Sequence, residues 1–210
     1  MKKLLLILTL MFALVSCQCS GNGEPTLNDN EKLGGIQVEN IIKTDFETML
    51  AKYGDADFRW YECDILLNDF LDEENDGTIA ELVNIYQTVV NRDSTSFDTQ
   101  VYKVQHFPNG KVFTDSIRGF WIENYPIHLD ELKVTYDSAY ALVMAVNLPK
   151  PHSQHVTLRN PIGPKGINPQ WIFGNTHSQI WVDATTGEIH ESNPAFPDDY
   201  LTRGPLGEWP

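Results

Sequence analysis

The sequence of 210 residues predicts an α+β fold in which helices pack on an antiparallel sheet. Three observations favour this class. Apolar residues recur at spacings of three and four within 38–53 and 129–148, which is typical of amphipathic helices. Between 58 and 123, Val, Ile, Tyr and Phe are frequent and partly alternate with polar residues, as in strands. Asn109-Gly110 lies between two of these segments and favours a tight hairpin, because this pair accepts positive φ.

The N-terminal half is predicted to begin with a helix over 38–53, which Gly54 terminates. The turn residues Asn75-Asp76-Gly77 and Pro108-Asn109-Gly110 follow, each between two β-like segments. These segments are 58–67, 79–90, 99–107 and 111–123. We therefore expect an antiparallel sheet directly after the first helix.

The C-terminal half begins with a second predicted helix within 129–148. Thr135 or Asp137 could serve as its N-cap, and Pro149 prevents it from continuing. A polar stretch from 149 to 169 contains several Pro and Gly residues and is interpreted as an inserted loop. A strand over 171–173 and a hairpin over 178–189 then complete an order of helix, strand and hairpin.

This C-terminal order resembles the PepSY family. The matching pieces are 136–146, 171–173 and 180–189, and the most specific stretch is Val182-Asp183-Ala184-Thr185-Thr186-Gly187-Glu188-Ile189. Its Asp and Thr side chains are expected to close a turn, with Gly187 at positive φ. The resemblance implies a small α+β module of secreted or membrane-attached proteins and of protease propeptides, which binds or restrains partners and has no catalytic residues.

These patterns divide the mature chain into an N-terminal α+β module over 36–125, a PepSY-like module over 126–193 and an irregular tail over 194–210. The N-terminal half shows the same coarse order of helix then strands as the C-terminal half. This order is compatible with two similar modules in tandem, although no residue-level repeat supports it.

The N-terminus carries an export signal over residues 1–16. Two lysines precede the apolar run Leu4–Leu14, which is too short to span a bilayer as a mature helix. Leu14-Val15-Ser16-Cys17 resembles the bacterial lipobox, which implies cleavage after Ser16 and a lipid anchor on Cys17. The alternative is an ordinary secretory signal with a chance cysteine. Residues 17–35 are rich in small and polar residues and are interpreted as a flexible tether.

Charge limits the partners of the chain. Removing residues 1–16 takes away two lysines and changes the formal net charge from −14 to −16. Such an acidic chain is repelled by nucleic acids and anionic lipids, so we expect no nucleic-acid partner and membrane attachment only through the acyl chains. The predicted location is the cell envelope, on the periplasmic or surface face of the outer membrane.

Cys63 and the acidic segment over 72–77 raise the question of site chemistry. Cys63 lies in an aromatic and aliphatic stretch and is interpreted as a buried, inert thiol, since no activating histidine is near in sequence. The segment Asp72–Gly77 resembles the start of a calcium loop, but Val83 stands where a bidentate Glu is required. An acidic hairpin turn is the favoured interpretation, and calcium binding remains an open alternative.

Histidines offer a possible metal site. His152, His155 and His177 could be combined with Asp183, but the spacing matches no common zinc motif, so surface histidines are the favoured interpretation. The tryptophans could form an exposed platform for sugars or peptides, although we expect most to belong to the core. These tryptophans are Trp60, Trp121, Trp171, Trp181 and Trp209.

Two functions therefore remain. The favoured one is an exported, lipid-anchored, non-enzymatic module that binds or restrains a protein or peptide partner outside the cytoplasm, with no cofactor and no catalytic or metal-binding residues. It predicts an apolar or edge-strand surface. The alternative is a small-ligand- or metal-binding protein, or a hydrolase, whose pocket gathers histidine, acidic and aromatic side chains. It predicts clustered ionisable groups with perturbed pKa values.

Overall fold

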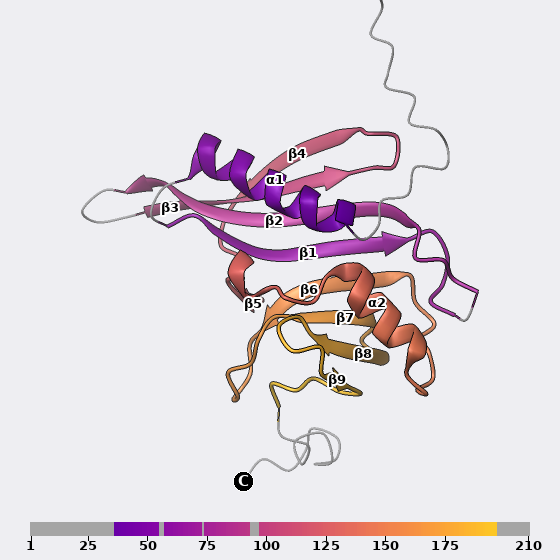
Figure 1. Cartoon of the computed structure of the whole chain (residues 1–210). Helices are drawn as coiled ribbons and strands as arrows, with labels where there is room; N and C mark the ends of the chain where they lie inside the picture. Colours follow the sequence, from indigo (N-terminus) through magenta and orange to yellow (C-terminus); the bar gives the residue numbers. More distant parts are fainter. Residues whose placement is uncertain (1–35, 55–56, 73, 93–96, 197–210) are drawn as a thin grey trace, which may run out of the picture.

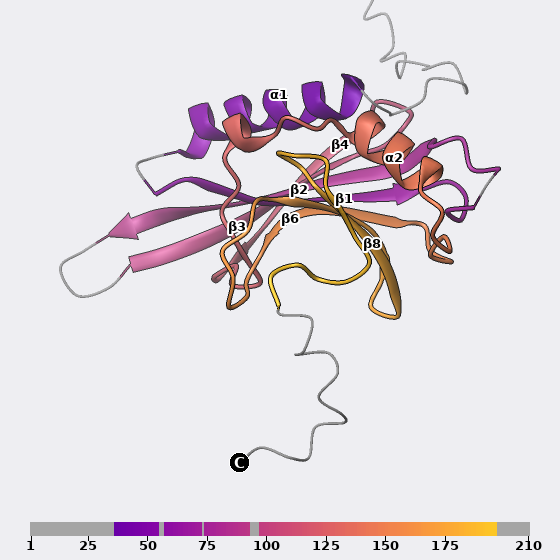
Figure 2. The same cartoon turned by 60° about the horizontal axis from the view of Figure 1, so that its bottom comes forward.

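The computed structural model describes residues 36–54, 57–72, 74–92 and 97–196. Two helices pack on one face of an open antiparallel sheet of nine strands, and Figure 2 shows both helices on the same side of that sheet. The predicted α+β class, with helices packed on an antiparallel sheet, is confirmed. We call the opposite side of the sheet the helix-free face.

The first half of the chain closely follows its predicted elements. Helix α1 ends where predicted, and the amide of Gly54 donates to the carbonyl of Leu50 at 2.9 Å. The Asn109-Gly110 hairpin is confirmed, with Gly110 at a φ of 76°. The elements are α1 (Ile36–Tyr53), β1 (Arg59–Leu67), β2 (Ile79–Arg92), β3 (Phe97–His106) and β4 (Val112–Arg118).

The predicted strand over 111–123 is wrong beyond Arg118. The chain leaves the sheet at Gly119, and the amide of Trp121 donates to Oε1 of Gln87 at 2.6 Å instead of to a neighbouring strand. Because Gln87 lies on the helix-free face, residues 119–123 cross that face. We call this segment the crossover.

The second half contains one strand where a loop was predicted. Thr135 is the N-cap of α2, accepting from the amide of Ser138 at 3.2 Å. Strand β6 lies inside the supposed loop 149–169, and only Val156 and Leu158 reach the core from it. The elements are β5 (Asn124–Tyr125), the 3₁₀ helix η1 (Leu129–Glu131), α2 (Tyr136–Ala145), β6 (His155–Pro161), β7 (Gln170–Asn175), β8 (Ser178–Asp183) and β9 (Ile189–His190).

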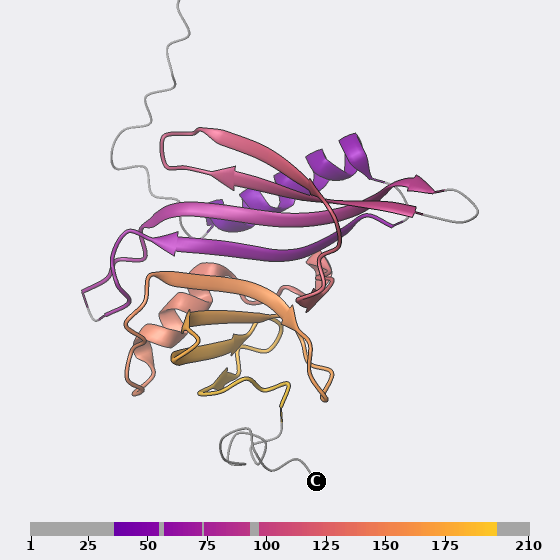
Figure 3. The same ribbon diagram turned by 180° about the vertical axis from the view of Figure 1, so that it is seen from behind.

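The sheet joins the two halves through their first strands. Its order is β4-β3-β2-β1-β6-β7-β8-β9, with β5 paired to β6 outside this path (Figures 1 and 3). Strands β1 and β6 pair antiparallel from Glu62 opposite Arg159 to Leu66 opposite His155. Each half is thus a helix followed by a four-strand meander, and β4 and β9 lie at the two outer edges.

The main hydrophobic core lies between the helices and the sheet. Trp60 and Trp171 are fully buried in it, as expected for core tryptophans, whereas Trp181 is buried outside this core cluster. Trp121 is half-buried on the crossover, and Trp209 lies outside the described residues. A polar contact also fastens α1 to the sheet, because the carboxylate of Asp45 accepts from Asn84 at 2.7 Å and contacts Nε2 of His106 at 2.8 Å.

In the described part of the chain, no helix has both the length and the apolar character needed to cross a membrane.

Candidate binding surface at the edge of the sheet

Strand β4 is the most exposed strand of the fold. All seven of its side chains are exposed to solvent. It pairs with β3 on one side, and within the described residues no strand pairs with its other side. An open strand of this length offers a row of backbone groups to any chain that lies beside it.

The register determines which backbone groups point outward. Gly119 donates to the carbonyl of Thr99 at 3.0 Å, and Phe107 donates to the carbonyl of Lys111 at 3.0 Å. Because hydrogen bonding alternates along an antiparallel strand, the odd-numbered residues of β4 bond to β3. The N–H and C=O groups of the even-numbered residues, such as Thr114, therefore point away from the sheet.

Large apolar side chains concentrate on and just after this strand. Nine large hydrophobic residues are exposed in the described part of the chain, and five of them lie between positions 112 and 122. Exposed apolar side chains that are grouped along one segment often mark an interaction site, whereas singly scattered ones are normal. The five are Val112 at 53% exposed, Phe113 at 57%, Ile117 at 63%, Phe120 at 58% and Ile122 at 77%. We call them, together with the outer backbone of β4, the β4 surface.

An acidic residue occupies the middle of this surface. Phe113, Asp115 and Ile117 share the helix-free face, because their neighbours on β4 lie opposite core residues of β3. Oδ1 of Asp115 accepts from the amide of Ser116 at 2.7 Å. That amide belongs to the outward-pointing set, so the carboxylate covers one donor of the open edge.

Lys103 lies next to this carboxylate. It is the direct cross-strand partner of Asp115, and its Nζ is 6.0 Å from the ring centroid of Trp121 on the crossover. The acidic side chain is thus flanked by a positive charge on the inner side and by solvent on the outer side.

A second notable cluster lies at the seam between the two halves. Glu62 of β1 is buried on the helix-free face, where its Oε2 accepts a hydrogen bond from the side-chain Nδ2 of Asn124 and lies 3.5 Å from Nε of Arg159. The pKa of Glu62 is raised to about 7, chiefly by burial and next by the nearby charge of Asp64, while Arg159 and the hydrogen bond from Asn124 act to lower it. Oδ1 of Asp64 in turn accepts from Thr157 at 2.9 Å.

This seam cluster and the pocket on the other face of the sheet do not form one site. A pocket of about 330 Å³ lies between α1 and η1 and is lined by apolar and polar side chains. Glu62 is not among them. Glu62 and this pocket therefore lie on opposite faces of the sheet. The lining residues are Phe46, Phe58, Arg59, Trp60, Ile127, His128, Leu129 and Asp130.

The histidines singled out in the sequence do not come together with Asp183. His152 stacks on Phe70 with ring centroids 4.1 Å apart, and His177 lies in the turn between β7 and β8. Asp183 is at the opposite end of β8 from His177. Throughout residues 36–54, 57–72, 74–92 and 97–196, no group of three or more His, Cys, Asp or Glu residues is placed to hold a metal ion.

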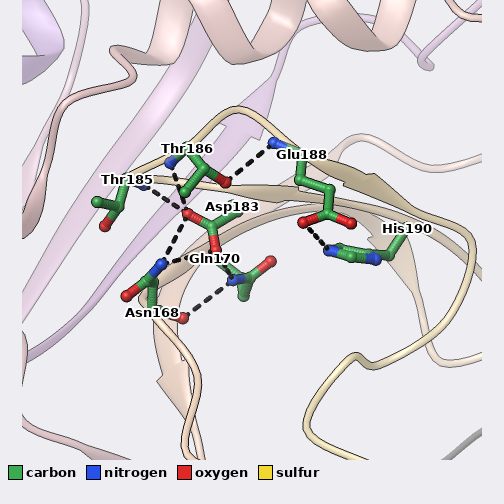
Figure 4. Close-up of polar contacts among 7 residues, drawn as sticks. All are labelled: Asn168, Gln170, Asp183, Thr185, Thr186, Glu188 and His190. Carbon is green, nitrogen blue, oxygen red and sulfur yellow. Dashed lines mark hydrogen bonds and ion pairs between the residues drawn. The ribbon is translucent and has the colours of Figure 1, made fainter.

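Asp183 instead closes a turn, as predicted (Figure 4). Its Oδ1 accepts from the amides of Thr185 at 2.8 Å and Thr186 at 2.7 Å, and its Oδ2 accepts from Asn168 at 2.9 Å. Burial acts to raise the pKa of Asp183, but these hydrogen bonds outweigh it and the pKa is lowered. Gly187 has a φ of 80°, as the turn requires.

The described residues of the acidic segment, Asp72 and 74–77, lie in the connection between β1 and β2. Its carboxylate and amide oxygens accept internal hydrogen bonds: Asp72 from the amide of Glu74 at 2.9 Å, and Asn75 from the amide of Gly77 at 2.7 Å. The hydroxyl of Tyr140, on α2, also donates to Oδ1 of Asn75 at 2.9 Å. The loop therefore docks on the other half of the molecule.

Cys63 is a free, fully buried thiol, as predicted. Burial raises its pKa well above the usual value, which removes the thiolate that a nucleophile requires. Cys17 and the predicted signal and tether segments lie outside the described residues.

Sequence reasoning missed both the β4 surface as an open edge and the seam cluster. Glu62, Asn124 and Arg159 are far apart in sequence, so no local pattern connects them. The apolar residues from Val112 to Ile122 were visible, but their alternation indicated only a strand and not its place in the sheet. Comparison with known proteins adds no further assignment: no family model, no curated protein and no solved structure matches this chain.

Proposed function

We propose that this chain is a lipid-anchored, non-enzymatic module of the cell envelope that binds a protein partner along the β4 surface. The observation that carries the proposal is an open edge strand whose seven side chains are all exposed and include three large apolar ones. An extended segment added to this edge would satisfy the outward backbone groups and cover apolar side chains in one step.

The energetics favour such an addition. Burying a Phe or Ile side chain completely contributes about 1.5–3 kcal/mol, and Phe113 and Ile117 are each more than half exposed. Backbone hydrogen bonds from a partner strand supply alignment, while these side chains supply contact area. Both contributions come from the same seven residues.

The finer description of the fold belongs to the same proposal. Two diverged copies of one PepSY-like module would explain why each half is a helix followed by a four-strand meander. It would also explain why the halves meet through their first strands, β1 and β6. In this arrangement the outermost strand of the N-terminal copy, β4, is left open for a partner.

The lipid anchor rests on the sequence alone. A lipid on Cys17 and a tether over 17–35 would hold the folded part near the membrane, where its partner would be an envelope protein. The acidity of the mature chain favours attachment through acyl chains over attachment through a charged surface.

The test uses a proline substitution that removes one backbone N–H group on the unpaired side of β4. The amide of Thr114 points outward, so Thr114→Pro removes one edge donor and leaves the ladder to β3 intact, whereas Thr114→Val keeps the donor. Each variant of the full chain carries a photo-crosslinking residue at position 117 and is expressed in the cells from which the protein comes. The amount of each envelope protein cross-linked to it is then measured.

The proposal expects one cross-linked protein with the wild-type edge and with Thr114→Val, and its loss with Thr114→Pro. A variant with the crosslinker at Ile162, which is exposed but lies outside the β4 surface, should not capture it. If Thr114→Pro does not fold, as judged by its melting curve, the double variant Phe113→Lys with Ile117→Lys replaces it in a pull-down with the captured protein. Equal capture by every variant would refute the proposal.

A further inference from the structure

The centre of β4 is chemically distinct from its two ends. Asp115 is the middle residue of the strand, with Phe113 and Ile117 two positions away on the same face. An added strand must therefore present a side chain directly opposite a carboxylate, with apolar side chains on either side of it.

A second copy of the chain does not meet this requirement. Two copies related by a two-fold axis pair their edges antiparallel, and the register that uses all seven residues places Asp115 opposite Asp115. Like charges directly opposite one another are destabilising, and each mature chain carries a formal net charge of −16. The central acid thus disfavours pairing of β4 with itself.

A strand with a central Lys or Arg meets the requirement in two ways. Its cation would extend the row that already contains Lys103 and Asp115, so that charges alternate across three strands. The carboxylate would then turn from the amide of Ser116 toward the cation, because a charged donor is the stronger partner. The freed amide could donate to the incoming strand.

We propose that the β4 surface recognises an extended protein segment in which one basic residue is flanked, two positions away on each side, by apolar residues. This inference rests on the proposed binding along β4 and specifies the chemistry of the partner. The basic residue lies opposite Asp115, and the apolar residues lie opposite Phe113 and Ile117. Recognition then depends on charge at one position and on apolar contact at two.

The test compares two synthetic peptides of nine residues. Both have Val at the third and seventh positions and Thr elsewhere, and the central residue is Lys in one and Glu in the other. The full chain, with Cys17→Ser and ¹⁵N labelling, is titrated with each peptide, and the amide shifts give both the affinity and the place of binding.

We expect the Lys peptide to bind about ten-fold more tightly than the Glu peptide. The amide of Ser116 should shift strongly with the Lys peptide, and Asp115→Lys should reverse the order of the two peptides. Asp115→Asn is the matched variant that removes the charge alone, and it should make the two peptides equal.

The outcomes separate this inference from the proposed function. If both peptides shift the β4 amides equally, edge binding stands and the charge specificity is refuted. A third outcome is that neither peptide shifts the β4 amides, but the crosslinker at position 117 still captures a protein and this capture is lost with Thr114→Pro. In that case only the proposed chemistry of the partner segment is refuted. If that capture fails as well, both proposals are refuted.

Discussion

The buried carboxyl of Glu62 should make the stability of the fold depend on pH in a defined window. Its pKa is about 7 in the folded protein against 4.5 for an ordinary glutamate, so the folded state binds the extra proton. The resulting stabilisation is complete below pH 4.5 and is lost as the pH rises through 7. At 1.36 kcal/mol per pH unit, the loss amounts to at most about 3 kcal/mol.

Glu62→Gln isolates this effect. The amide oxygen can still accept from Asn124, but the side chain no longer titrates. We expect the free energy of unfolding of the wild type to fall between pH 4.5 and 8 by about 2–3 kcal/mol more than that of Glu62→Gln. The measurement is urea unfolding followed by tryptophan fluorescence at several pH values.

Glu123→Gln is the matched control, because Glu123 is an exposed glutamate on the crossover. It should keep the pH dependence of the wild type. Parallel curves for wild type and Glu62→Gln across the whole range would refute the reasoning, since they would mean that Glu62 does not bind the proton that its burial requires.

Two further predictions concern the anchor and the turn between β8 and β9. Cys17→Ala should abolish incorporation of labelled palmitate and move the protein from the membrane fraction to the soluble fraction, and retained label on the variant would contradict the lipid-anchor assignment. Asp183→Ala should lower the free energy of unfolding by about 1–3 kcal/mol, because it leaves the amides of Thr185 and Thr186 without their acceptor. Asp183→Asn keeps an oxygen acceptor, so its free energy of unfolding should fall less than that of Asp183→Ala. Equal decreases for the two variants in denaturant titrations would argue against Asp183 as the acceptor that closes the turn.

Local signals predicted the elements whose structure is set locally. The apolar spacing before Gly54 gave α1 to within two residues of its start, and Asn109-Gly110 gave its hairpin. Asp183 and Gly187 gave the turn between β8 and β9. In each case the residues that determine the structure are neighbours in sequence.

Strand β6 was missed for a physical reason. It is central in the sheet, yet only Val156 and Leu158 face the helices, and prolines precede and end it. Its position depends on pairing with β1, nearly a hundred residues earlier, and no local pattern records that pairing. The same holds for the seam of Glu62 with Arg159 and for the open side of β4, both of which depend on strand order.

The joining of the two halves through β1 and β6 has a consequence for assembly at high concentration. The antiparallel pairing of β1 with β6 holds the two halves of one molecule together. The same pairing can form between β1 of one chain and β6 of another, because the two strands are already complementary. The crossover, residues 119–123, would then act as the hinge of a domain-swapped dimer. Such exchange would need no new interface and would leave β4 open in both copies, so that a swapped pair would be bivalent for the same partner.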